Sequence, residues 1–266
     1  MVMKRRDFLA SCAAAIATAQ FGCSSSAAPA KVPVLGLIFP TDTRHPEEGI
    51  AMYGKSLSFV EESLGLTTIT PEGFDSVIPL IPAAAKKLAA KGADAIELLG
   101  TSLTFYKGEA FNQKLRETVT NASGLPATTM SNGVIAGLKV VGAKRVAVAT
   151  AYIDEVNNRL RAFLREHGFE PVVITGMGIE DKDKAEKVPE KVILEFAARV
   201  CKSAPEADSL LVSCGGFPTL ELIAPLEART GVPVISSMPH GLWAGARLVG
   251  MSGAAPGYGK LLSREV

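Results

Sequence analysis

The sequence has few of the residues that build metal centres and disulfide frameworks. Its 266 residues include three histidines and four cysteines, and the cysteines form no C-x-x-C pair. Cys12 and Cys23 lie within the first 30 residues, and the histidines lack the spacing of metal ligands. We therefore expect neither a disulfide framework nor a bound metal.

An excess of charge of one sign and the common nucleotide-binding motifs are also missing. Lysine and arginine total 28 against 27 acidic residues, so no net field points to nucleic acid or to an anionic membrane. No G-x-G-x-x-G follows the first expected strand, and the chain has no G-x-x-x-x-G-K-[ST]. We expect no nucleotide cofactor, no organic cofactor of another kind and no nucleic-acid partner.

Long apolar runs are scarce, and the one near the N-terminus is short. The alanine-rich segment Ser11–Ala19 is too short for a bilayer, which takes about 20 apolar residues, so no membrane span is expected. It follows the pair Arg5 and Arg6, an order that resembles a twin-arginine export signal. We assign residues 1–30 to such a signal and expect a folded, exported, periplasmic protein. Cleavage before Lys31 and a lipid anchor at Cys23 both remain open.

The rest of the chain alternates apolar runs with amphipathic segments. Strands are expected at residues 34–39, 64–70, 93–99, 127–130, 145–149, 171–176, 209–214 and 233–236. Helices are expected at residues 76–91, 110–122, 153–167, 189–202, 220–229 and 241–248, and another helix ends at residue 141. Strands that alternate with helices are typical of parallel sheets joined by crossover connections. The fold class is therefore α/β.

An internal repeat divides the chain into two similar halves. Residues 93–102 resemble residues 207–216, and residues 128–137 resemble residues 236–245, in the same order and at nearly the same offset. We expect two pseudo-symmetric Rossmann-like domains with parallel sheets. The first domain takes residues 31–141 plus 242–266, and the second takes residues 142–241. The active site is expected in the cleft between them.

The end of the strand expected at residues 209–214 carries the main functional signal. Gly215 and Gly216 follow Cys214, and without side chains they let backbone N–H groups approach a bound anion. A thiol beside such amides can move a proton while the amides hold negative charge. The repeat places Gly100 at the matching position of the first half. A buried cysteine before an ordinary turn is the alternative interpretation.

Other polar residues follow the neighbouring strands. Ligands of open α/β sheets bind beyond the carboxyl ends of the strands. That edge gathers Pro40, Thr41, Thr101, Ser102 and Tyr152. Their hydroxyl and amide donors are neutral and suit a carboxylate, or the enediolate that forms when its α-carbon becomes carbanionic. For each hydroxyl, a strand-end or helix-capping role is equally open.

Several segments resemble the arylmalonate decarboxylase family of the aspartate/glutamate racemase superfamily. They are residues 70–73, 99–106, 149–154, 211–216 and 256–259, within a likeness that extends from about residue 34 to residue 261. The resemblance implies a cofactor-free decarboxylation of an aryl-substituted or related malonate to a chiral monocarboxylic acid. Its substrate would be a small dicarboxylate.

The resemblance also implies roles for individual residues. One carboxylate would be held in a dioxyanion hole that is formed by Thr101, Ser102, Tyr152, Gly215 and Gly216. The other would leave as carbon dioxide from a small apolar pocket that is formed by Pro40, Leu66, Ile69 and Leu103. Cys214 would protonate the enediolate on one face, and Gly100 leaves the other face without an acid.

One segment departs from the family pattern. The charged run Glu180–Lys184 stands where the family has small and apolar residues. It is either a solvated loop or a device that brings Lys182 close to a polar substrate side chain. His240 is expected to be a polar residue at a helix start rather than a catalytic base.

Two other functions stay open at this point. A racemase or cis–trans isomerase of the same superfamily would need an acid/base residue on each face of the substrate, and Gly100 supplies none. An exported binding protein for a small carboxylate could use the same cleft, although it would not need Cys214.

Overall fold

The structure, a computed structural model, describes residues 31–42 and 46–264. The expected export signal at residues 1–30, with Cys23, lies outside the described residues. Within them, no helix is both long and apolar enough to cross a membrane.

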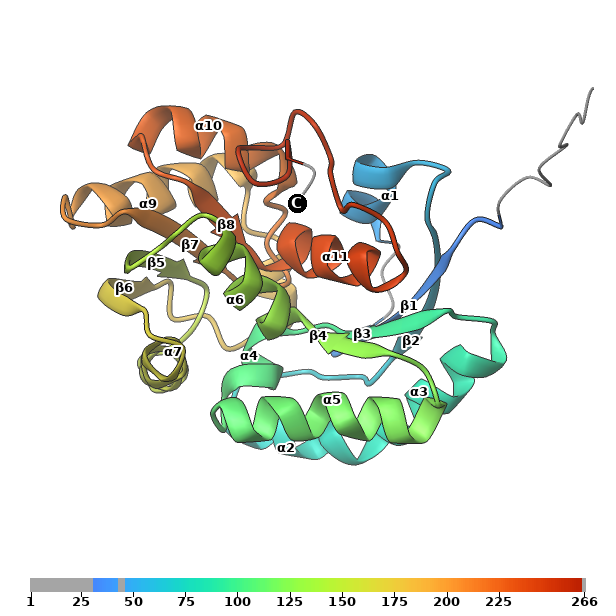
Figure 1. Cartoon of the computed structure of the whole chain (residues 1–266). Coiled ribbons are helices and arrows are strands. Elements are labelled where there is room, and N and C mark those ends of the chain that lie inside the picture. Colours follow the sequence, from blue (N-terminus) through green and yellow to red (C-terminus); the bar gives the residue numbers. More distant parts are fainter. Residues whose placement is uncertain (1–30, 43–45, 265–266) are drawn as a thin grey trace, which may run out of the picture. The chain divides into compact units, whose positions relative to one another are not determined.

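The first sheet contains four parallel strands in the order β2-β1-β3-β4. They are β1 (Val34–Phe39), β2 (Ser58–Ser63), β3 (Ala95–Leu98) and β4 (Ala127–Thr129). One face is covered by α3 (Ile81–Ala90) and α5 (Glu109–Ser123), and the other by α11 (Ser237–Leu248) (Figure 1).

The second sheet repeats this topology with four parallel strands in the order β6-β5-β7-β8. They are β5 (Arg145–Thr150), β6 (Glu170–Gly176), β7 (Ser209–Ser213) and β8 (Val234–Ser236). Its helices are α7 (Asp154–Glu166), α9 (Glu190–Lys202), α10 (Leu220–Thr230) and α6 (Met130–Val140). The α/β class and the two similar parallel sheets are as the sequence predicts.

The last helix of each half crosses to the other half. α6 follows β4 yet contacts β8, and α11 follows β8 yet contacts β3 and β4. The two helices pack closely against each other, because a Cβ on Gly133 would lie 2.5 Å from the carbonyl oxygen of His240. The described residues from Val32 onward form one compact unit, so the domain boundaries expected at residues 141 and 241 stay a prediction.

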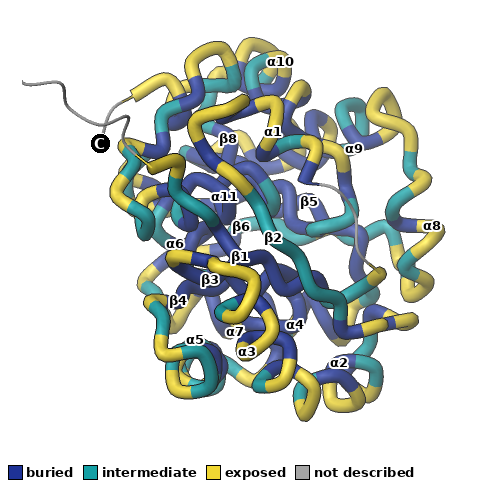
Figure 2. Tube along the Cα trace, turned by 90° about the vertical axis from the view of Figure 1, so that its right-hand side faces the viewer, coloured by how far each residue is buried: buried dark blue, intermediate teal, exposed yellow. Residues whose placement is uncertain are grey.

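The prediction of a strand at residues 64–70 is wrong. The second strand of the first sheet along the chain is β2, which ends at Ser63. Gly65 has a φ of +73°, which breaks the extended conformation. β2 is an edge strand, and its Glu62 forms ion pairs with Lys87 and Lys91. Its sequence is therefore polar and lacks the apolar run by which the other strands were predicted. Figure 2 shows β2 less buried than the neighbouring β1.

Several helical regions also differ from expectation. The helix expected at 76–91 is divided into α2 (Pro71–Val77), a 3₁₀ turn (Ile78–Leu80) and α3, since Pro79 and Pro82 each fit only a first turn. α11 begins at Ser237 rather than Gly241, with Pro239 inside its first turn. The short helices α1 (Glu47–Tyr53), α4 (Thr101–Phe105) and α8 (Lys182–Glu186) were not expected.

Candidate active site

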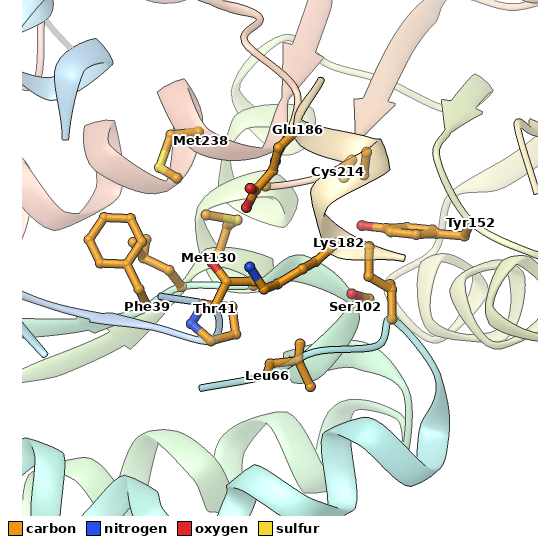
Figure 3. A pocket seen from close by; sticks show the side chains of 17 residues that line it. Phe39, Thr41, Leu66, Ser102, Met130, Tyr152, Lys182, Glu186, Cys214 and Met238 are labelled. Carbon is orange, nitrogen blue, oxygen red and sulfur yellow. The ribbon is translucent and has the colours of Figure 1, made fainter. Parts of the chain in front are cut away.

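One pocket lies at the carboxyl ends of the central strands of both sheets. It has an empty volume of about 590 Å³, which includes open solvent at its mouth. Its lining contains these residues expected from the sequence: Pro40, Thr41, Leu66, Ile69, Gly100, Ser102, Tyr152, Cys214, Gly215 and Gly216. The two sheets thus bring most of the expected residues to one place (Figure 3).

Cys214 follows β7 and is buried, with 3% of its surface exposed. Burial raises the pKa of its thiol to about 11, and the charge of Glu186 acts in the same direction. The backbone N–H groups of Gly216 and Phe217 oppose this shift by hydrogen bonding to the sulfur. At neutral pH Cys214 is therefore a thiol that can donate a proton rather than a thiolate nucleophile.

Tyr152 provides a phenol on the wall beside Cys214. Its Oη lies 3.3 Å from Ser213 Oγ, and burial raises its pKa well above the ordinary value. Hydrogen bonds from Ser213, Ser102 and Thr101 lower that pKa in part. The phenol is thus a neutral donor at any physiological pH.

Thr101 and Leu103 lie outside the pocket lining, unlike the other expected residues. Thr101 donates a hydrogen bond to Ser237 Oγ at 2.6 Å, so its hydroxyl supports the wall from behind. Leu103 packs behind Gly100, where its Cβ would lie 3.3 Å from an added side chain. Their expected direct contacts with the substrate stay predictions.

The glycines at the two strand ends serve different needs. Gly100 has a φ of +91°, and a Cβ there would lie 2.8 Å from Pro40 Cγ. Gly216 has an ordinary φ, but a Cβ on it would meet the Glu186 side chain at 3.0 Å. Gly100 is therefore required by conformation as well as by space, whereas Gly216 is required by close approach alone.

α8 belongs to the charged segment for which the sequence allowed two interpretations, and it forms one wall of the pocket. Lys182 and Glu186 lie one turn apart and both line the pocket, whereas Asp183 and Lys184 are exposed. Figure 3 shows both side chains pointing into the pocket. Glu180 accepts a hydrogen bond of 2.7 Å from Ile69 N, which ties the segment to the apolar wall. Within the charged run, Lys182 is therefore the residue that the description as a solvated loop does not fit, since the other four are exposed.

Residues 35–262 match the protein family described as arylmalonate decarboxylase. The chain is also 43% identical over 238 residues to arylmalonate decarboxylase of Bordetella bronchiseptica, covering 89% of this chain and 99% of that one. The chain belongs to the arylmalonate decarboxylase family. A more distant relative is a maleate isomerase of Nocardia farcinica, 23% identical over 84% of this chain and 88% of its own.

Solved structures agree with this family membership. One is a liganded arylmalonate decarboxylase mutant, with a glycine changed to cysteine and a cysteine to serine. It aligns with a TM-score of 0.84 at 42% identity over 87% of this chain and 99% of that chain. A maleate isomerase of Pseudomonas putida aligns with a TM-score of 0.81 at 22% identity, over 89% of this chain and all of that one. At that identity the likeness shows the shared fold alone.

This member of the family lines its pocket with several residues that sequence reasoning missed. They are Phe39, Leu99, Met130, Ala185, Glu186 and Met238. Met130 and Met238 occupy matching positions of the repeat, at the starts of α6 and α11. The internal repeat aligns these two methionines, so it could have predicted both as residues of the pocket.

His240 lies outside the pocket, in the first turn of α11. Its Nδ1 is 3.0 Å from both N and O of Ser236, and burial lowers its pKa to about 4. A neutral, fully buried imidazole at this place agrees with a helix-start role. Over the described residues, no group of three or more histidine, cysteine, aspartate or glutamate side chains could hold a metal ion.

Proposed function

We propose that this protein is a carboxy-lyase that removes carbon dioxide from an aryl-substituted or related malonate without a cofactor. The observation that carries the proposal is a protonated, buried Cys214 on the same pocket as the neutral donors Ser102 and Tyr152. Membership of the arylmalonate decarboxylase family supports the reaction type.

The neutral donors suit the charge that develops. One carboxylate accepts hydrogen bonds from Ser102, Tyr152 and the amides near Gly215, with Thr101 behind them and Gly216 and Thr41 beside them. When the bond to the second carboxylate breaks, its electron pair stays on the α-carbon and spreads into the retained carboxylate. The resulting enediolate carries two negative charges on oxygen, which fixed donors stabilise more than they stabilise the ground state.

Cys214 then completes the reaction. Its sulfur gives the proton to the α-carbon and becomes a thiolate, which the N–H groups of Gly216 and Phe217 stabilise. Water returns the proton to sulfur before the next turnover. Because Gly100 offers no acid on the opposite side, protonation from Cys214 produces one enantiomer.

Carbon dioxide leaves toward the apolar side of the pocket. Pro40, Leu66 and Ile69 line that side, with Leu103 packed behind Gly100. These apolar side chains accept neutral carbon dioxide once the bond to the α-carbon has broken. A racemase or isomerase would need a second acid/base residue at Gly100, so the pocket favours decarboxylation over those reactions.

The proposal is tested by incubating the protein with a panel of aryl- and alkylmalonates. We expect carbon dioxide release and a single enantiomer of each chiral monocarboxylic acid, retained after exhaustive dialysis against a chelator. Absence of release across the panel, or reactivation by added zinc or manganese, would contradict it.

We also propose that the protein is exported through the twin-arginine signal, whose residues lie outside the described part of the chain. Replacing both Arg5 and Arg6 by lysine should retain the protein in the cytoplasm, as measured by cell fractionation. Cys23→Ser separates the two processing routes, since only a lipoprotein would lose its membrane association.

A further inference from the structure

Lys182 is held against the pocket by its own helix and by the neighbouring wall. It is the first residue of α8, after Asp181, whose side chain accepts a hydrogen bond from Lys184 N at 3.1 Å. Asp181 also forms an isolated bridge with Thr68, in the segment that supplies Leu66 and Ile69. Only 15% of the Lys182 side chain is exposed. Most of this side chain is therefore covered, and it forms part of the pocket lining.

The ammonium lies at the β1 end of the pocket and stays charged. Lys182 Nζ is 2.7 Å from Asp183 Oδ1 and 3.4 Å from Asp42 Oδ2, and these carboxylates, together with the charge of Glu186, raise its pKa. Both partners are largely exposed, so water already solvates their charge. An ammonium has three N–H groups, and counted over the described residues these two partners leave one for the pocket.

Charge is sparse elsewhere in the lining. Among the described residues that line the pocket, Lys182 is the one cation and Glu186 the one anion. The neutral donors lie after β3 and β5, on Ser102 and Tyr152, whereas Lys182 contacts Asp42 after β1. Figure 3 shows the ammonium on the Thr41 side, away from the Tyr152 ring.

A malonate carries two carboxylates on one carbon, and they diverge. If one accepts hydrogen bonds from Ser102 and Tyr152, the other points to a different part of the pocket. We propose that Lys182 binds this second carboxylate, an inference that rests on the proposed function. The pocket then selects dicarboxylates over monocarboxylates of the same shape.

This contact has a consequence for the rate. The second carboxylate leaves as neutral carbon dioxide, so its attraction to the ammonium weakens on the way to the transition state. An interaction that is stronger in the ground state lowers both KM and kcat. Lys182 thus gives affinity for the dicarboxylate and slows each turnover relative to an apolar residue at the same place.

The test compares phenylmalonate with phenylacetate, which lacks only the second carboxylate. Both are titrated calorimetrically into Cys214→Ala, in which turnover is suppressed, with and without Lys182→Met. We expect Lys182→Met to reduce the preference for phenylmalonate at least about tenfold, the size of a lost charge-assisted hydrogen bond. The Kd of phenylacetate should change less than twofold.

Lys184→Met is the matched control, because it removes the same charge from the same helix at an exposed position. It should leave the preference unchanged. With Cys214 intact, Lys182→Met should raise both KM and kcat for phenylmalonate. Lys182→Gln, a polar but uncharged replacement that is one atom shorter, is the second variant if methionine disturbs α8.

An unchanged preference in Lys182→Met and Lys182→Gln would overturn the inference, as would equal weakening of both ligands. A fall in kcat would overturn the account of the rate. The binding measurements do not depend on turnover. Tight phenylmalonate binding without carbon dioxide release in the unmodified protein would refute the proposed function and leave this inference standing.

Discussion

β3 and β7 end at matching places in the two sheets, yet Gly100 follows the first and Cys214 the second. At Gly100 the backbone has a positive φ, and Pro40 fills the space that a side chain would need. Cys214 carries a buried side chain at the matching place, and the following Gly216 leaves room for the Glu186 side chain. One half therefore contributes space and donors, and the other contributes the acid.

The comparison extends into the strands themselves. The repeat aligns Glu97 of β3 with Leu211 of β7, and both are fully buried. Among the described residues, both carboxylate oxygens of Glu97 lack a hydrogen-bond partner. Equivalent backbone positions in the two halves thus carry very different side chains. The repeat predicts which positions correspond, but not the chemistry of the residues that occupy them.

The largest effect is expected from removing the acid of the second half. Cys214→Ala should fold normally and lose kcat by about 10²–10⁴, since general acid catalysis is worth that much. Cys201→Ala is the matched control, because Cys201 is also a buried cysteine of the second half but lies outside the pocket. Steady-state decarboxylation of phenylmalonate measures both. Near-normal turnover in Cys214→Ala would refute its role as proton donor.

Giving the first half an acid of its own tests whether the two strand ends face one substrate. Gly100→Cys should lose at least about tenfold in decarboxylation rate, because the new Cβ crowds Pro40 and the positive φ costs about 1–3 kcal/mol. It should also begin to racemise the monocarboxylic acid product, since an acid/base pair would then span the pocket.

The readout for Gly100→Cys is chiral chromatography of one product enantiomer after incubation in deuterium oxide. Gly100→Ala separates crowding from chemistry, because it adds the same Cβ without a thiol. It should lose rate and show no racemisation. A folded Gly100→Cys variant without α-deuterium would mean that the two strand ends do not face one substrate.

A smaller effect, on stability, is expected at Glu97, because its carboxyl group titrates whereas its counterpart Leu211 does not. Burial raises the pKa of Glu97 to about 8 in the folded protein, above its ordinary value of 4.5. The folded state therefore holds this proton longer than the unfolded state, and stability falls as pH rises from about 4.5 through 8. Glu97→Gln removes that titration, so its Tm should gain several degrees on the parent between pH 5 and pH 9.

Differential scanning calorimetry across that pH range measures the difference. Glu72→Gln, at an exposed position of the same half, is the control. If the Tm difference for Glu97→Gln stays constant with pH, Glu97 is not buried in the form described.

The smallest effect is expected at Glu48, which joins the two halves. Glu48 Oε1 accepts hydrogen bonds from Thr219 N at 2.8 Å and Leu220 N at 2.7 Å, at the start of α10. Burial raises its pKa to about 7, helped by the charges of Glu190 and Glu221. At pH 6, Glu48→Ala removes these two hydrogen bonds and should lower the free energy of unfolding by about 1 kcal/mol, as the loss of other helix caps does.

Denaturant unfolding at pH 6 measures this loss, with Glu47→Ala as the exposed control on the same helix. Glu48→Gln should recover most of the stability, because its carbonyl oxygen keeps the acceptor. Equal losses in the alanine and glutamine variants would show that the contact with α10 contributes nothing.

The sequence alone determined the features that depend on local pattern. Apolar runs ending in Gly100 and Cys214 identified β3 and β7, because central strands of a parallel sheet are buried on both faces. The internal repeat predicted two similar halves, and short segments such as residues 99–106, 149–154 and 211–216 predicted the family that the comparisons confirm. Edge strand β2 was missed for the same reason, since an edge strand needs no continuous apolar run.

Tertiary structure alone decided which charges meet the pocket. Lys182 and Asp42 are far apart in the sequence, and only the fold brings their charged groups to 3.4 Å. The sequence named Lys182 but left a solvated loop open as the alternative; in the structure α8 turns Lys182 toward the pocket and leaves Lys184 exposed. The high pKa of Cys214 likewise arises from burial by both halves. Burial and electrostatics depend on neighbours from distant segments, which no local pattern encodes.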